Sequence, residues 1–296
     1  MLVSIIIPVH QTHDFFKNCV GSALVQTYGN IEVILACNGN LEIKQCQEYL
    51  SKNDSRIVYI KTQNGRHNAR NEAIEIAKGD FIQFLDYDDF LFPNKLERQL
   101  GIVDGSYWNS VLIISQWKKF HKDINENYVF PFKYLFDESM IDAGQLIQKL
   151  AKSRGFLATS SWLISRDLIS GVKWIDSPND DAVFLSEILK KIPDVILIPE
   201  ILSGYRIHTE NTSSIRKKSE FDKLMLSWKL IHQNLVLLGV PELNLYIYNA
   251  YLNLIGYSKG INKYRLSEVI RRSVVFGFRA KVGASMFKEI KMKLLK

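Results

Sequence analysis

The stretch Leu2-Val3-Ser4-Ile5-Ile6-Ile7-Pro8 opens the pattern that decides the fold class. It is short, apolar and rich in β-branched residues, which is typical of a buried strand. Similar runs occupy residues 31–37, 56–60 and 80–85, and helical periodicity occupies residues 13–26, 41–52 and 67–78. Strands and helices in alternation imply right-handed crossovers. The first hundred residues therefore predict an α/β fold with a doubly wound, mostly parallel sheet.

The rest of the chain continues this pattern and then becomes helical. The sequence predicts a helix after Pro93, strands at residues 111–115 and 195–198, and helices at residues 143–152 and 181–191. Residues 117–139 are aromatic and irregular and predict no element. From Lys217 onward only helical patterns remain. We expect two domains, an α/β domain at residues 1–215 and a helical, basic extension at residues 216–296.

The composition places the chain among ordinary folded proteins. It has 296 residues, of which 47% are hydrophobic and 23% charged, so it is not disordered as a whole. Its three cysteines include no CxxC pair, which argues against a disulfide framework or a zinc site and for reduced thiols. We expect no signal peptide, because the first residues lack a basic region followed by a long apolar run, and no apolar run approaches about 20 residues. We expect a cytoplasmic protein that does not span a membrane.

The charge is concentrated at one end of the chain. Residues 263–296 contain ten Lys or Arg and two Glu, so their formal charge is +8, whereas that of the whole chain is +7. The remaining residues are close to neutral. A basic tail of this kind fits an anionic surface, either lipid headgroups or nucleic acid.

Three carboxylates crowd into Phe84-Leu85-Asp86-Tyr87-Asp88-Asp89, just after an apolar run. In a doubly wound sheet, ligands bind beyond the carboxyl ends of the strands. Carboxylates this close repel one another, and a divalent cation such as Mn²⁺ or Mg²⁺ offsets that repulsion and bridges to phosphates. The alternative is a solvated acidic turn or a helix cap. The position at the end of the fourth predicted strand favours a metal site.

Three further motifs have both a functional and a structural interpretation. In Asn64-Gly65-Arg66-His67-Asn68-Ala69-Arg70-Asn71 a glycine turn opens a helix, and Arg70 near its start either binds a phosphate or lies on the surface. Asp180 and Asp181 open another helix, as caps or as a general base. His208, in Tyr205-Arg206-Ile207-His208, is a structural residue or a ligand. The residues alone leave these alternatives open.

Taken together, these motifs resemble the ordered signatures of family 2 glycosyltransferases with the GT-A fold. The resemblance covers residues 3–213 and rests on five motifs in the expected order: residues 3–10, 69–71, 86–89, 180–181 and 205–208. It implies a role for each matching residue. The nucleotide base would be bound by Pro8, His10 and Asn38, and the nucleotide would also contact Arg70. The ribose would be bound by Asp86, with Tyr87 beside it, and the metal by Asp88 and His208. Asp181 would be the general base with Asp180 beside it, and Arg206 would assist the diphosphate.

The sequence departs from the family pattern at the base-binding position. The family usually has Asp-Asp-Gly-Ser where this chain has Cys37-Asn38-Gly39-Asn40. An asparagine oxygen still accepts from a uracil N–H, but the amide adds two donors. A UDP-sugar remains the expected donor, with a non-UDP donor as the alternative. Asp180 replaces a usual glutamate, and His10 a usual tyrosine.

The resemblance also implies a reaction and a setting. Family members of this type invert the anomeric carbon, so Asp181 would deprotonate an acceptor hydroxyl as that hydroxyl attacks the sugar. We expect a glycan acceptor, lipid-linked, in O-antigen, capsule or lipooligosaccharide biosynthesis, and an enzyme attached peripherally to the inner face of the cell membrane. In the C-terminal segment, Met286, Phe287, Ile290 and Leu294 share one helical face that would meet the lipid. Alternatively, these helices pack on the chain itself or on a second copy in a homodimer.

Four other classes of protein fit the sequence less well. A sugar-nucleotide pyrophosphorylase needs a glycine-rich loop after the first strand, and a dinucleotide-dependent dehydrogenase needs G-x-G-x-x-G there; Pro8-Val9-His10-Gln11 has no glycine. A non-catalytic nucleotide-binding or membrane scaffold would not need the carboxylates and histidine that the motifs retain. A nucleic-acid binder is suggested only by the basic tail, so we expect no nucleic acid among the partners.

Overall fold

The structure of the protein is a computed structural model that describes residues 1–51, 53–103, 110–208, 215–261 and 263–295. Lys52, the predicted end of a helix, and Lys296, the last residue of the basic tail, lie outside the described residues. The chain forms two compact units. The first contains residues 1–141, 157–176 and 193–209, and the second contains residues 142–156, 177–192 and 210–296.

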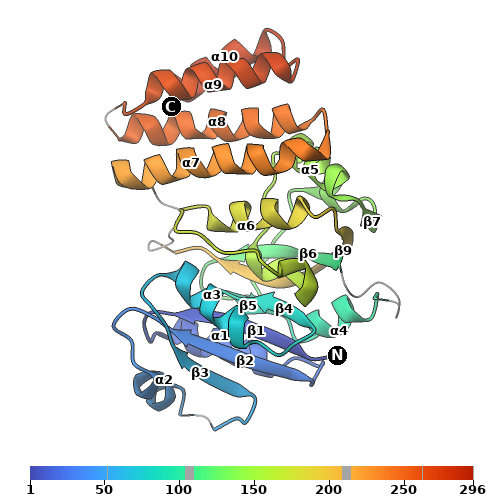
Figure 1. The fold of residues 1–296 in the computed structure, drawn as a ribbon, viewed down its shortest axis with the longest axis vertical. Helices are drawn as coiled ribbons and strands as arrows, with labels where there is room; N and C mark the ends of the chain where they lie inside the picture. The colour runs from blue at the N-terminus through green and yellow to red at the C-terminus, as the bar shows by residue number, and fades with distance from the viewer. Residues whose placement is uncertain (52, 104–109, 209–214, 262, 296) are drawn as a thin grey trace. The chain divides into compact units, whose positions relative to one another are not determined.

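The first unit is built around a sheet (Figure 1). Among the described residues the sheet has nine strands in the order β3-β2-β1-β4-β8-β6-β9-β5, and β7 also pairs with β9. The strands are β1 (Val3–Val9), β2 (Ile31–Cys37), β3 (Ile57–Lys61), β4 (Phe81–Phe84), β5 (Phe90–Leu91), β6 (Val111–Phe120), β7 (Met140–Ile141), β8 (Trp162–Ser165) and β9 (Asp194–Arg206). Strands β3, β2, β1 and β4 are parallel, as are β6 and β9, and the other pairings are antiparallel.

The predicted alternation of strands and helices in the first hundred residues is confirmed. The helices that connect these strands are α1 (Asp14–Leu24), α2 (Ile43–Leu50) and α3 (Arg66–Ile76), and α4 (Lys95–Leu100) follows Pro93. Every residue of β1 and β2 is buried, as expected for parallel strands that are covered on both faces. This burial explains why the two strands read as continuous apolar runs rather than as alternating ones.

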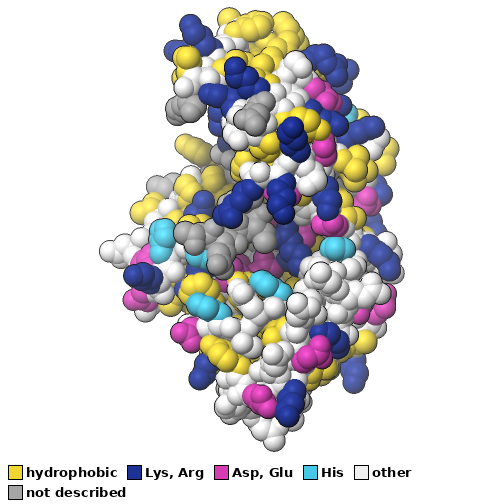
Figure 2. All heavy atoms as spheres, turned by 90° about the vertical axis from the view of Figure 1, so that its left-hand side faces the viewer, with side chains coloured by type: hydrophobic (Ala, Val, Ile, Leu, Met, Phe, Trp, Pro, Cys, Tyr) yellow, Lys and Arg dark blue, Asp and Glu magenta, His cyan; other side chains and the backbone are white. Residues whose placement is uncertain are grey.

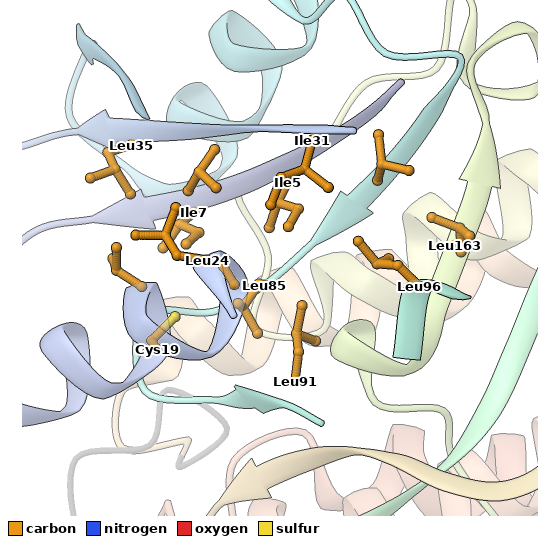
Figure 3. Packing of buried hydrophobic residues seen from close by; sticks show 14 of the residues in the cluster. Ile5, Ile7, Cys19, Leu24, Ile31, Leu35, Leu85, Leu91, Leu96 and Leu163 are labelled. Carbon is orange, nitrogen blue, oxygen red and sulfur yellow. The ribbon is translucent and has the colours of Figure 1, made fainter. Parts of the chain in front are cut away.

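The main apolar core of the first unit lies on one face of this sheet (Figure 3). Ile5 and Ile7 of β1 and Leu35 of β2 point toward Cys19 and Leu24 of α1 (Figure 3). These residues belong to one cluster because side chains two apart on a strand share a face. This cluster packs α1 against one face of β1 and β2.

Gly79 allows β4 to lie beside β1. A Cβ at this position would lie 2.5 Å from the backbone nitrogen of Ser4, which belongs to a strand and has little room to move. We expect Gly79→Ala to lower the free energy of unfolding by about 1–3 kcal/mol, as overpacking does. Gly21→Ala on α1 is the control, because nothing lies within 4 Å of its added Cβ. Urea unfolding of both variants checks this, and equal stability would contradict the packing argument.

The second unit is helical in the described residues (Figure 1). Its helices are α5 (Ala143–Ser153), α6 (Asp180–Leu189), α7 (Lys218–Leu235), α8 (Leu243–Gly260), α9 (Leu266–Arg279) and α10 (Ser285–Leu295). Helix α8 is the centre of the unit because α5, α7, α9 and α10 all contact it. None of the described helices is long and apolar enough to cross a bilayer. The contacts within the chain group α5 and α6 with the C-terminal helices. The domain boundary expected at residue 215 stays a prediction.

Candidate active site

Three parallel strands of the first unit bring candidate residues to one edge of the sheet. His10 follows β1, Asn38 follows β2 and Asp86 lies just beyond β4. Asn38 is buried, and both its backbone N–H and its side-chain amide donate to the carbonyl oxygen of Val9, at 2.8 and 3.1 Å. An aspartate could not make the second bond because it has no donor when ionised. The asparagine therefore ties the ends of β1 and β2 together.

His10 and Tyr87 lie next to each other above this edge. Their rings meet edge to face with centroids 4.8 Å apart, and Gln11 donates to the Tyr87 hydroxyl at 2.8 Å. His10 is exposed, and Pro8 is buried in β1. The exposed imidazole thus offers a flat surface on which a ligand ring can stack.

Arg70 is fixed from two sides at the start of α3. Its side chain is only 2% exposed, and one guanidinium nitrogen lies 2.5 Å from an Asp86 carboxylate oxygen. The guanidinium also lies over the Trp174 ring, 4.2 Å from its centroid. Asn71, the next residue, accepts from the Trp174 backbone N–H and donates to its carbonyl oxygen, both at 2.9 Å. The arginine is therefore held in one orientation against Asp86.

Asp88 and His208 form the second pair of the site, although they are 120 residues apart. His208 Nε2 lies 2.7 Å from Asp88 Oδ2, and the two side chains are 15% and 13% exposed. The topology explains the encounter. The acidic turn runs directly into β5, and β5 pairs antiparallel with the end of β9, from which His208 follows.

Arg206 and Asp89 stabilise the contact between Asp88 and His208 through hydrogen bonds to the backbone around it. Asp89 accepts from the Arg206 backbone N–H at 3.0 Å, and Arg206 Nε donates to the Asp88 carbonyl oxygen at 2.8 Å. The Arg206 guanidinium lies between the rings of Phe15 and Phe120, with both centroids 4.3 Å away. Burial lowers the pKa of Arg206. Its Nε and one terminal nitrogen donate to the backbone carbonyls of Asp88 and His121, so the side chain supports the acidic turn.

The carboxylates of this turn favour a neighbouring cation. Burial, followed by the charge of Asp86, raises the pKa of Asp88, and burial with the charges of Asp88 and Asp86 raises that of Asp89 well above its usual value. Asp88 and His208 together offer an oxygen and a nitrogen donor that suit Mn²⁺ or Mg²⁺. Within the described residues no group of three or more His, Cys, Asp or Glu could hold a metal.

Asp180 and Asp181 begin α6 in the second unit. Asp180 is 3% exposed, and its Oδ1 accepts from the Asp181 backbone N–H at 3.0 Å. Asp181 is half-buried, and its Oδ1 accepts from the Ala182 N–H at 2.8 Å. Burial and the charge of Asp181 raise the pKa of the Tyr246 phenol on α8. Of the two carboxylates, Asp181 is therefore the one that solvent or an acceptor can reach.

The sequence did not single out several residues that shape the first-unit site. Trp174, Phe15 and Phe120 contact the two arginines, and Asp89 was seen only as part of the acidic cluster. The aromatic residues carry no signal in the sequence that separates them from core residues. For Asp89 a signal was present, since a third adjacent carboxylate needs a buried partner of its own.

Fold and site together define a glycosyltransferase with the GT-A fold. The Glycosyl transferase family 2 model matches residues 4–171, and the chain belongs to this family. A Haemophilus influenzae protein described as an uncharacterized glycosyltransferase is 27% identical over 262 residues, which cover 87% of this chain and 98% of that protein. The chain also matches rickettsial glycosyltransferases, of which it spans only 17–32% of the length.

Solved structures share the fold at low sequence identity. Staphylococcus aureus TarS 1–349 in complex with UDP-GlcNAc superposes with a TM-score of 0.63 at 15% identity, over 94% of this chain and 90% of that one. The Pyrobaculum calidifontis mannosyltransferase PcManGT, in complex with GDP-Man and Mn²⁺, gives 0.53 at 10% identity, over 99% and 86%. The predicted GT-A architecture is thereby confirmed.

Proposed function

We propose that this glycosyltransferase inverts the anomeric carbon as it moves a sugar from a nucleotide-diphosphate sugar, by preference a UDP-sugar, to a hydroxyl of a glycan acceptor. The observation that carries the proposal is the meeting of Asp88 with His208 beside the Arg70–Asp86 pair. The Asp88–His208 pair is suited to a metal and a diphosphate, and the Arg70–Asp86 pair to a ribose and a phosphate. Both halves lie at the carboxyl edge of the sheet, where ligands of such folds bind.

The residues of the first unit have distinct tasks in this proposal. The base would lie against Pro8, His10 and Asn38. Asp86, with Tyr87 beside it, would accept from the ribose hydroxyls, and Arg70 would contact the nucleotide. Asp88 and His208 would hold Mn²⁺ or Mg²⁺, which when bound supplies positive charge to the departing diphosphate. Arg206 would assist the diphosphate, and its bonds to Asp88 and Asp89 help to keep His208 at Asp88. The TarS complex with UDP-GlcNAc supports a UDP-sugar, whereas the PcManGT complex with GDP-Man keeps the non-UDP alternative in view.

The acceptor side of the proposal rests on the second unit. Asp181 would take the proton of the acceptor hydroxyl while that oxygen bonds to the anomeric carbon and the bond to the diphosphate breaks. Asp180 positions Asp181 through the start of α6. A lipid-linked acceptor in a surface-glycan pathway, met at the inner face of the membrane, fits the basic C-terminal helices.

A panel of nucleotide-sugars tests the proposal. We expect the purified chain to hydrolyse one donor slowly with Mn²⁺ or Mg²⁺ present, and to transfer its sugar when a suitable glycan is added. Isothermal titration should show that UDP binds more tightly with the cation than with excess chelator. A chain that bound no nucleotide diphosphate under either condition would instead support a scaffold role.

Asp89 gives a prediction about positioning. We expect Asp89→Ala to lower transfer by about 10- to 100-fold, the usual effect of removing a group that orients a metal ligand. Asp89→Asn keeps a carbonyl oxygen for the Arg206 N–H and should recover most of the activity. The cation concentration for half-maximal rate should rise in the alanine variant and stay near normal in the asparagine variant. Identical metal dependence in both variants would mean that Asp89 matters only for folding.

A further inference from the structure

Two of the four apolar residues of α10 that the sequence assigned to the lipid face, Met286 and Ile290, pack inside the second unit. Met286 is fully buried and Ile290 is 6% exposed. Met286 occupies the space that a Cβ at Gly277 of α9 would need, and Tyr248 of α8 borders the same place. The expectation that Met286 and Ile290 meet a membrane is therefore wrong, because α8 and α9 already cover them.

The opposite face of α10 carries other apolar residues and also Phe287, which the sequence had placed on the face of Met286 and Ile290. Phe287, Met292 and Leu295 are 56%, 46% and 76% exposed, which is unusual for large apolar side chains. Lys288 and Lys291 are exposed between them. The spacing of these five residues, at i, i+1, i+4, i+5 and i+8, gathers them on one side of a helix. Apolar and cationic groups thus alternate on a single surface.

Helix α9 extends this surface. Phe278 is 63% exposed, and its ring contacts that of Phe287 with centroids 6.2 Å apart. Arg271, Arg279 and Lys281 are exposed on α9 or just after it. At the top of Figure 2, where Figure 1 places α9 and α10, hydrophobic side chains gather with lysine and arginine beside them. We call Phe278, Lys281, Phe287, Lys288, Lys291, Met292 and Leu295 the α9–α10 surface.

The charges of this surface are not neutralised within the second unit. Of the two acids after residue 263, Glu289 pairs with Arg154 at 2.7 Å and Glu268 lies 3.1–3.4 Å from Arg272 and Arg265. Across the described part of the chain, Lys281, Lys288 and Lys291 form no ion pair. The exposed rings are therefore bordered by cations that have no carboxylate of their own.

We propose that the α9–α10 surface binds the headgroup region of an anionic lipid bilayer. The rings and Leu295 would enter the interface while the lysines reach the lipid phosphates, as amphipathic helices and snorkelling side chains do. A second copy of the chain fits less well, because a twofold contact through this surface would bring like charges together. Lipid binding itself does not depend on sugar transfer. Only its purpose, access to a lipid-linked acceptor, rests on the proposed function.

Co-sedimentation of the full chain with vesicles, without any nucleotide, tests the proposal. We expect binding to phosphatidylcholine vesicles that contain phosphatidylglycerol, little binding to pure phosphatidylcholine, and weaker binding at high salt. Each cation near an anionic surface contributes roughly fivefold to the partition coefficient. The triple variant Lys281→Gln, Lys288→Gln, Lys291→Gln should therefore lose about 100-fold. Replacing Phe278 and Phe287 by serine should also release the protein.

A matched triple variant separates the surface from net charge. Lys44, Lys173 and Lys190 are exposed lysines elsewhere, and changing them to glutamine removes the same charge. This control should bind vesicles nearly as wild type, and thermal melting should show that all variants fold. Equal loss in both triple variants, or no binding by the wild type, overturns the proposal. Self-association that depends on Phe278 and Phe287, without vesicle binding, would assign the surface to a second copy. Nucleotide-sugar turnover in solution would stand unchanged in either case.

Discussion

Asp88→Ala is expected to reduce sugar transfer by more than about 10³-fold, because several kcal/mol of transition-state stabilisation at the diphosphate are lost. Asp88 is mostly buried beside His208, and burial and Asp86 raise its pKa. Such a carboxylate is stabilised in its charged form when a cation is bound. The substitution removes one of the two donors that the described residues place together. The cation-dependent part of UDP binding should disappear with it.

Steady-state transfer and isothermal titration of UDP, each with Mn²⁺, Mg²⁺ and excess chelator, measure both effects. Asp194→Ala is the matched control, because Asp194 is an exposed aspartate at the start of β9 and should leave both quantities unchanged. Circular dichroism shows whether the acidic turn still permits folding. Full activity of the wild type in excess chelator would exclude the proposed metal role, whatever the variant does.

The strands that the sequence predicted well are those with a clear local signal. Continuous apolar runs bounded by turns located the first four strands to within one or two residues. For strand β9 the sequence predicted only residues 195–198, the run that precedes Pro199. The strand continues to Arg206, and Pro199 lies where its pairing with β6 is irregular, between Ile198 and Ile201. A sequence pattern does not reveal such an irregularity, since it depends on the partner strand.

The elements that were not predicted are short or are made by pairing. Strand β8 has four residues, too few to display a period, and β5 and β7 have two each. They exist because a neighbouring strand offers them backbone hydrogen bonds. These pairings nevertheless complete the site, since β5 and β9 bring Asp88 to His208. The motifs predicted which residues matter, and only the topology shows how they meet.

Side-chain environments limited the prediction of the site in the same way. The change to Asn38 was interpreted as a question of base identity, whereas in the structure its amide bonds the end of β1. Arg206 is expected to assist the diphosphate, which stays a prediction, and the structure adds bonds from its guanidinium to the backbone carbonyls of Asp88 and His121. Both outcomes depend on tertiary neighbours that lie 29 and 85–118 positions away. Local sequence carries no record of such neighbours.

Asp181→Asn is expected to leave donor binding nearly intact and to slow transfer by about 10²- to 10⁴-fold, the usual effect of losing a general base. The isosteric amide can still accept from the Ala182 N–H, so the start of α6 should keep its shape. It cannot take a proton from an acceptor hydroxyl. The loss of rate should therefore appear in kcat. The dissociation constant for UDP with Mn²⁺ should stay within about twofold of wild type, because the substitution does not change the contacts that bind the donor.

Asp180→Asn is the matched comparison that shows which of the two carboxylates is the general base. Asp180 is 3% exposed and bonds the backbone at the start of the same helix, whereas Asp181 is half-buried. Each carboxylate accepts one backbone N–H, so burial is what distinguishes them, and the buried Asp180 is poorly placed to meet an acceptor. We therefore expect Asp180→Asn to cost far less in kcat than Asp181→Asn, with thermal melting used to correct for loss of folded protein. If the order were reversed at equal stability, the general base would be Asp180, and the helix would present its carboxylates differently in the presence of acceptor.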